Sequence, residues 1–165
     1  VLAAIQIQVK AALDNDKLLE KLRGSEGEKN IRDQQNALIT SLNLRLNGVS
    51  KKRTRLYEDY AEGLLDEAEY SFAKKSYDEQ YADLSRRLDE AVQRRSKFDE
   101  AMSVDNKWIT LMKSVSTATQ LSQDLVDESV ELVKVHEGGA VELVMKYGDI
   151  YELTIQSIKE VQEAM

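Results

Sequence analysis

The sequence predicts a mainly α-helical protein. We expect a long antiparallel helical coiled-coil hairpin, additional short helices, and one small β-hairpin near the C-terminus. Three observations support this fold class. The 165 residues include no Pro and only 7 Gly, so little interrupts a helix. A seven-residue repeat of large side chains runs through the middle of the chain. Two runs of alternating β-branched residues flank Gly138 and Gly139, which is typical of a hairpin.

The first expected element is an N-terminal helix within 1–24, which we treat as a separate region. Its apolar residues recur every three or four positions, as on one face of a helix. Gly24 follows the last of them and predicts the end of the helix. These apolar residues are Leu2, Ile5, Val9, Ala12, Leu13, Leu19 and Leu22.

A second, longer helix is expected to begin at Ser25. Ser25 and Glu28 have the three-residue spacing of a capping box, in which each side chain bonds a free backbone N–H group. Gly48 lies inside this helix and costs roughly 1 kcal/mol relative to Ala without breaking it. Gly63 is the predicted end.

The next helix should begin at Asp66, which forms a second capping box with Glu69. Two long helices joined by so short a turn can only be neighbours if they are antiparallel. The sequence therefore predicts an antiparallel coiled coil over 25–102, with its tip near 61–67. At ~1.5 Å per residue, each helix would be on the order of 50 Å long.

The seam of this coiled coil is predicted from the seven-residue repeat. Tyr side chains at such positions imply looser packing than Leu would give, because their hydroxyl groups must reach solvent. Residues of this kind at helical spacing are most simply interpreted as seam fillers. The predicted seam includes Tyr70, Tyr77, Leu84, Leu88 and Phe98.

The remaining region, 103–165, should contain short helices and the hairpin. We expect Asp105 to cap a helix that carries Trp108, and Ser122 to cap another. The polar run from Ser114 to Gln120 predicts a loop. The alternating β-branched residues on both sides of Gly138 and Gly139 predict the β-hairpin at about 132–147.

A final amphipathic helix completes this region. Asp149 and Glu152 form one more apparent capping box at its start. A lone two-stranded hairpin is marginal in water, so the preceding strands should lean on a helix or on strands from elsewhere.

Composition excludes several kinds of chemistry. Without Cys there is no disulfide, thiolate zinc site or cysteine nucleophile, and His136 is the single His. No phosphate-binding loop, zinc-protease motif or nucleophile elbow occurs. Glu137 beside Gly138 and Gly139 could form an anion nest, but a hairpin turn explains these residues more simply. We therefore expect no catalytic residue, no bound cofactor and no small-molecule substrate for this chain.

Charge is unevenly placed along the sequence. Residues 1–119 contain 20 basic and 20 acidic residues, whereas residues 120–165 contain 3 and 10. The net charge is -7, which argues against a self-sufficient DNA-binding module because that binding needs excess Lys and Arg. No stretch is long and apolar enough for a membrane span, so no membrane partner is expected. The first residue is Val1 rather than Met, and we expect the chain to be part of a longer protein.

One segment departs from its surroundings. Residues 56–70 contain six acidic residues and no basic one. Leu64 and Leu65 lie in the predicted turn, where polar residues are usual. They form a candidate docking surface if they are exposed, or they close the end of the seam if they fold back, and both interpretations stay open.

The same segment resembles the coiled-coil motif of the large serine recombinases, the phage integrases and transposon resolvases. In that family, Leu-Tyr-x-x-Tyr-x-x-Gly leads into Glu-Tyr and Lys-x-x-Tyr. The later segment 125–147 resembles the closing helix and hairpin of the family. The matching residues are Leu56, Tyr57, Tyr60, Gly63, Glu69, Tyr70, Lys74 and Tyr77.

The resemblance implies a function without catalysis in this chain. The serine nucleophile and the cysteine-ligated zinc of the family have no counterpart here, so zinc is expected only in a missing part of the parent protein. What the resemblance implies is subunit–subunit contact through the coiled-coil tip, controlling synapsis and directionality of DNA recombination. Partners would be other recombinase subunits, a directionality factor, and DNA through the missing parts. The compartment would be the cytoplasm, with a bacterial or phage gene.

The contact residues implied at the tip are Leu56, Tyr57, Tyr60, Gly63, Leu64 and Leu65. The alternative function is a stand-alone helical scaffold or adaptor protein that acts by coiled-coil interaction. A parent reading frame with a catalytic domain and Cys pairs before Val1 would distinguish the two.

Overall fold

The fold is mainly α-helical, with long helices and a two-stranded antiparallel sheet near the C-terminus, which confirms the predicted fold class. The computed structural model describes residues 2–117, 120 and 122–165. The chain forms two compact units. We call Arg32–Ser96 the arm, and the rest, up to Ile31 and from Lys97 onward, the head unit.

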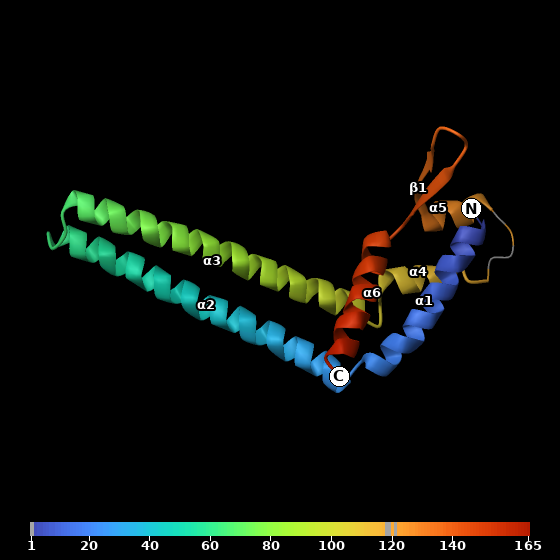
Figure 1. Cartoon of the computed structure of the whole chain (residues 1–165), viewed down its shortest axis with the longest axis horizontal. Helices are drawn as coiled ribbons and strands as arrows, with labels where there is room; N and C mark the ends of the chain where they lie inside the picture. The colour runs from blue at the N-terminus through green and yellow to red at the C-terminus, as the bar shows by residue number, and fades with distance from the viewer. Residues whose placement is uncertain (1, 118–119, 121) are drawn as a thin grey trace. The chain divides into compact units, whose positions relative to one another are not determined.

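The arm is an antiparallel pair made by most of two 36-residue helices, α2 (Glu26–Ala61) and α3 (Glu67–Met102). These helices lie side by side in Figure 1. Contacts between them advance in opposite directions along the chain. Tyr60 stacks on Tyr70 near the turn, and Arg53 pairs with Asp78 further along at 2.8 Å.

The seam of the arm is thin and mixed in character. Only three of its described side chains form a fully buried apolar cluster: Leu42, Val49 and Leu84. Large side chains occupy much of the rest, and the Arg53 guanidinium lies 4.7 Å from the ring centroid of Tyr81. Cα atoms of the two helices accordingly seldom come within 8 Å of each other. Partly buried residues that pack on the cluster are Leu46, Tyr77, Tyr81, Leu88 and Ala91.

The turn between the helices is a glycine-terminated helix end. Gly63 has φ +74°, and its N–H donates to the Tyr60 carbonyl at 3.0 Å. The next N–H, from Leu64, donates to the Asp59 carbonyl at 2.9 Å. This pair of bonds is a Schellman motif, which satisfies carbonyl groups at the end of α2 and requires the left-handed conformation at Gly63.

The capping box at α3 is confirmed, whereas at α2 the Ser25 cap is confirmed and Glu28 bonds the N–H of Gly24 instead of that of Ser25. Asp66 and Glu69 exchange hydrogen bonds between side chain and backbone N–H at 3.0 and 2.8 Å. Ser25 accepts from the Glu28 N–H at 3.2 Å, while the Glu28 carboxylate accepts from the Gly24 N–H. These bonds fix where α2 and α3 begin.

The head unit packs helices α1 (Leu2–Leu22), α4 (Lys107–Ser114), α5 (Gln123–Ser129) and α6 (Gly148–Glu163) around one apolar core. The core also takes residues from the end of α3, so Phe98, predicted in the coiled-coil seam, lies in the head core. Sequence-based boundaries at 24/25 and 102/103 follow helix ends, whereas the head unit joins the first helix to the C-terminal region. Buried core residues include Ile5, Leu19, Met102, Trp108, Met112, Leu125, Ile150, Ile158 and Val161.

A buried polar residue starts α4. Asn106 is 1% exposed, and its side-chain amide oxygen Oδ1 accepts from the Ile109 N–H at 3.1 Å. Its amide nitrogen donates to the Ala101 carbonyl and to the Thr154 hydroxyl, at 2.9 and 2.8 Å. The prediction that Asp105 caps this helix was wrong, because only the amide of Asn106 can serve these donors and acceptors together. At α5 the predicted cap is confirmed, since Ser122 accepts from Leu125.

The β-hairpin consists of β1 (Val130–Val135) and β2 (Val141–Met145), a little earlier than the predicted 132–147. The register pairs Val135 with Val141 and shifts between Val130 and Leu132. Leu143 and Met145 at the base pack against the head core, as expected of strands that must lean on other elements.

The start of α6 differs from the prediction. The helix begins at Gly148 after Tyr147, which has a left-handed backbone (φ 57°) and provides no side-chain cap. Asp149 therefore lies inside the first turn, so the predicted Asp149–Glu152 capping box was wrong. Of the predicted loop, Ser114 ends α4 and 115–117 form a turn, while 118 and 119 lie outside the described residues.

Candidate functional site

The end of the arm brings the predicted tip residues together but treats its two leucines differently. Leu64 is 68% exposed, whereas Leu65 is half-buried. Neither interpretation describes both residues, because one leucine is exposed and the other is half-buried. Leu56 is buried beneath the end, while Tyr57 is 62% exposed. An apolar surface of modest size is thus available to a partner.

An aromatic pair closes this end of the arm. The rings of Tyr60 and Tyr70 stack with centroids 4.3 Å apart and an angle of 17° between planes. One ring comes from the last turn of α2 and the other from the first turn of α3. Stacking contributes stabilisation beyond that of the area the rings bury, and it favours a fixed spacing of the two helix ends. The exposed Leu64 is therefore carried on a rigid support.

A shallow groove of about 390 Å³ lies directly behind the end, between α2 and α3. Its apolar part is formed by the buried Leu56 and the two rings of Tyr57 and Tyr70. Its polar part contains the ion pairs of the arm. The full lining is Ser50, Arg53, Thr54, Leu56, Tyr57, Tyr70, Lys74 and Asp78.

Asp78 is the acidic centre of that polar part. Its carboxylate lies 2.8 Å from the Arg53 guanidinium and 2.6 Å from the Lys74 ammonium. The hydrogen bond from Lys74 holds the pKa of Asp78 below its ordinary value, with Arg53 acting in the same direction. Asp78 in turn raises the pKa of Lys74. With two cations around one carboxylate, the floor of the groove keeps a positive charge.

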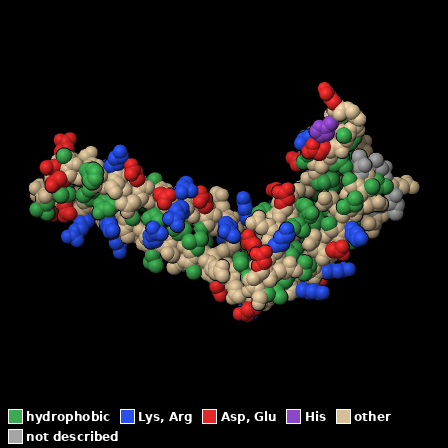
Figure 2. Space-filling view, in the orientation of Figure 1, with side chains coloured by type: hydrophobic (Ala, Val, Ile, Leu, Met, Phe, Trp, Pro, Cys, Tyr) green, Lys and Arg blue, Asp and Glu red, His purple; other side chains and the backbone are tan. Residues whose placement is uncertain are grey.

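Charge is strongly segregated along this part of the arm. We call 58–69 the acidic end, because it contains six acidic residues and no basic one. We call 50–57 and 70–78 the basic collar, because together they contain six basic residues and one acidic residue, Asp78. In Figure 2, acidic side chains gather at the end of the arm and Lys and Arg lie further along it.

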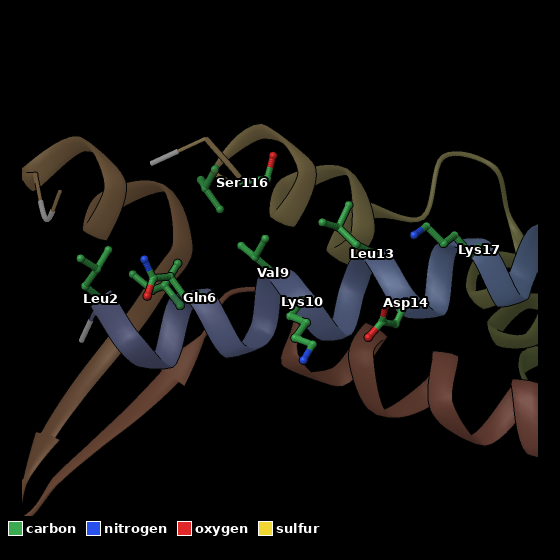
Figure 3. Close-up of a pocket in the computed structure, with 10 residues that line it drawn as sticks. Leu2, Gln6, Val9, Lys10, Leu13, Asp14, Lys17 and Ser116 are labelled. Atoms are coloured by element: carbon green, nitrogen blue, oxygen red, sulfur yellow. The ribbon is translucent and has the colours of Figure 1, made fainter. Parts of the chain in front are cut away.

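The head unit contains two further hollows, of which one runs along α1. It is about 270 Å³ in volume, and Figure 3 shows Val9 and Leu13 pointing toward the segment that carries Ser116. Lys10 and Asp14 lie along the same helix. The second hollow, of about 930 Å³, is lined by Trp108 and by residues from the start of α6. Neither hollow brings together a set of groups that suggests a reaction.

The residues that the structure describes were compared with what a metal site and a membrane span require. Across them, no group of three or more His, Cys, Asp or Glu side chains is arranged to hold a metal ion. His136 instead lies 3.0 Å from Glu142 on the hairpin, where Lys134 also pairs with that carboxylate. Over the same described residues, the helices lack a stretch of the length and apolarity needed to cross a bilayer.

Comparison with known proteins adds no assignment: no family model, no curated protein and no solved structure matches the chain.

Sequence reasoning found the end of the arm but missed the groove behind it. The Tyr and Leu residues were identified from their motif and the predicted turn. The partnership of Arg53 and Lys74 with Asp78 depends on which residues of two distant helical segments meet. A signal was present in the sequence, since placing the turn at Gly63 brings the level of Arg53 close to that of Asp78.

Proposed function

We propose that this chain is a protein-contact module that acts through the end of its arm, within a serine-type DNA recombinase. In this proposal it mediates contact between recombinase subunits that are bound to two DNA sites, in the cytoplasm of a bacterial cell. Strand cleavage and zinc binding belong to other parts of that recombinase, and a directionality factor acts through the arm.

The observation that supports the contact role best is the exposed Leu64 on its aromatic support. Leu64 is 68% exposed, and it adjoins the end of the arm that the stacked Tyr60 and Tyr70 rings close. A partner can therefore bury apolar area there with little loss of side-chain entropy. The surface is far smaller than a permanent interface requires. Weak, reversible association is what a regulated synapse needs.

The observation that supports the recombinase context is the sequence motif, whose residues lie at the end of the arm. Its Tyr60 and Tyr70 form the stack, and its Gly63 forms the helix end. Its Leu56 lies under them. These four motif positions thus have a physical role at the end of a helical hairpin, which is the part of such recombinases that contacts other subunits.

The contact role predicts concentration-dependent association of the chain in low salt, with loss of that association in Leu64→Asp. Burying a charge in an apolar contact is unfavourable, so we expect affinity to fall by at least about tenfold. Leu44→Asp is the matched control, because Leu44 is also 68% exposed and also lies in the arm. Sedimentation velocity over a range of concentrations measures the effect. Equal behaviour of the two variants would count against the contact role of the end.

The alternative, a helical scaffold or adaptor protein, makes a different prediction about the gene. A recombinase has a catalytic domain with a serine nucleophile and Cys pairs encoded before Val1. Sequencing the reading frame around this chain distinguishes the two, because a scaffold has neither feature.

A further inference from the structure

The acidic end and the basic collar are neighbouring surfaces of the arm that carry opposite charge. The acidic end has six carboxylates and no cation, and the collar has six cations and one carboxylate. That one carboxylate, Asp78, is already held by Arg53 and Lys74. The collar therefore keeps most of its positive charge.

The arm does not neutralise these two surfaces by itself. One ion pair joins them, between Arg55 and Asp59 at 4.0 Å. Among the residues that the structure describes, no ion pair forms at Lys51, Lys52 or Lys75 of the collar. The same holds, within the described chain, for Glu58, Glu62 and Glu67 of the acidic end.

Helix geometry limits pairing between the two surfaces to residues near their boundary, such as Arg55 and Asp59. From Ser50 to Ala61 the helix α2 is continuous, and at ~1.5 Å per residue it spans roughly 17 Å. Side chains cannot cross most of that distance. Water solvates these exposed charges in the free chain, and most of them stay available to opposite charges on another molecule.

We infer that this other molecule is a second copy of the chain, and that two arms dock side by side in antiparallel stagger, each acidic end on the other's basic collar. This inference rests on the proposed contact role of the arm and specifies its partner and geometry. Such a contact has twofold symmetry, so the acidic end of each copy contacts the basic collar of the other and the pairing occurs twice. The axis lies at the level of Tyr57, halfway between Ser50 and Leu64.

One apolar contact fits the same stagger. Because the axis lies at the level of Tyr57, the Tyr57 rings of the two copies, each 62% exposed, meet across it. Leu64 of one copy then lies at the level of Ser50 of the other, where Arg53 and Thr54 line the groove. The ion pairs surround the tyrosine contact as a polar rim.

Electrostatics disfavours the simpler arrangement in which two ends meet head-on. That contact would bring twelve carboxylates together, six from each copy, without a cation from either acidic end. Like charges placed face to face oppose association and slow the encounter. The stagger replaces that repulsion with attraction, and salt should weaken it.

Cysteine cross-linking tests the geometry directly. The chain has no Cys, so each introduced thiol is the only one present. Ser50→Cys and Glu62→Cys are mixed in equal amounts at low salt and oxidised. The comparison samples are Glu62→Cys alone and Glu62→Cys mixed with Thr40→Cys, an exposed position further along the arm. We expect the 50–62 disulfide to form about tenfold faster than either comparison, because docking raises the local thiol concentration.

The outcomes separate this inference from the contact role itself. A dominant 62–62 disulfide would overturn the stagger while leaving association through the end intact. Equally slow oxidation in all samples, together with an inert Leu64→Asp, would overturn both.

Charge reversal provides a second readout with a built-in rescue. Lys51→Glu and Glu62→Lys should each weaken association roughly tenfold, since a twofold contact loses each pair twice. Combining the two changes in one chain should restore most of the affinity. If the double variant is no better than the single ones, the pairing of collar and end is wrong.

Discussion

One substitution, Gly to Ala, should have opposite effects at two positions of the arm. Gly48 lies inside α2, and Gly63 ends that helix with φ +74°. At both positions a new Cβ would have no heavy atom within 4 Å. Packing is thus the same for the two changes, and only the backbone conformation differs.

The magnitudes follow from that difference. Gly48→Ala should raise the free energy of unfolding by about 1 kcal/mol, because Ala loses less backbone entropy in a helix. Gly63→Ala should lower it by about 1–2 kcal/mol, because a Cβ is unfavourable in the left-handed region. The two variants should therefore differ by roughly 2–3 kcal/mol.

Urea denaturation followed by far-UV circular dichroism measures the effect on the helices. The single Trp, Trp108, lies in the head core, so its fluorescence reports the other unit and serves as an internal control. We expect fluorescence transitions to change less than the helical signal if the units unfold separately. A Gly63→Ala variant as stable as Gly48→Ala would refute the Schellman turn as the element that closes the arm.

Two further predictions concern the head unit. Asn106→Ala should lower the free energy of unfolding of the head unit by about 2–4 kcal/mol, since it removes a helix cap and leaves buried partners unsatisfied. Urea denaturation followed by Trp108 fluorescence measures this change. Asp105→Ala is the control and should change the same free energy by less than about 0.5 kcal/mol. The hydrogen bond from Lys134, and then that with His136, holds the pKa of Glu142 below its ordinary value of 4.5. The Glu142 carboxylate therefore stabilises the hairpin above pH 4.5, and this stabilisation is lost as the pH falls through the lowered pKa. The Lys134 N–H faces β2 in a hydrogen-bonded pair with Glu142, so its amide hydrogen exchange, scaled for intrinsic rates, should show this loss in the wild type and not in Glu142→Gln.

Local signals in the sequence predicted much of the fold. Ser25 with Glu28 and Asp66 with Glu69 fixed the starts of the long helices, because a capping box involves only neighbours in the chain. Gly63 fixed the turn for the same reason. An antiparallel pair then follows from the shortness of the connection.

Features that depend on tertiary contact were beyond such reasoning. Asp105 and Asn106 are both good caps by type, and only burial against Thr154 selects Asn106. Tyr147 starts α6 in a left-handed conformation that its residue type disfavours. Phe98 continues the seven-residue repeat, yet at its level the neighbours belong to the head core.

The same division applies to the candidate site. Their place in the predicted turn identified Leu64 and Leu65, but their different exposures depend on how the turn packs on the arm. The charge of the acidic end could be counted in the sequence. Its relation to the collar required the pairing of Arg53 with Asp78, which shows that 50–57 and 70–78 form one surface.

The contact role is tested most directly by synapsis of two DNA sites, measured with the recombinase that contains this chain. Leu64→Asp is compared with Leu44→Asp, and DNA binding to single sites is measured in parallel. The proposed function predicts that Leu64→Asp abolishes paired-site complexes while single-site binding and the Leu44→Asp variant stay normal. Normal synapsis by Leu64→Asp would contradict it.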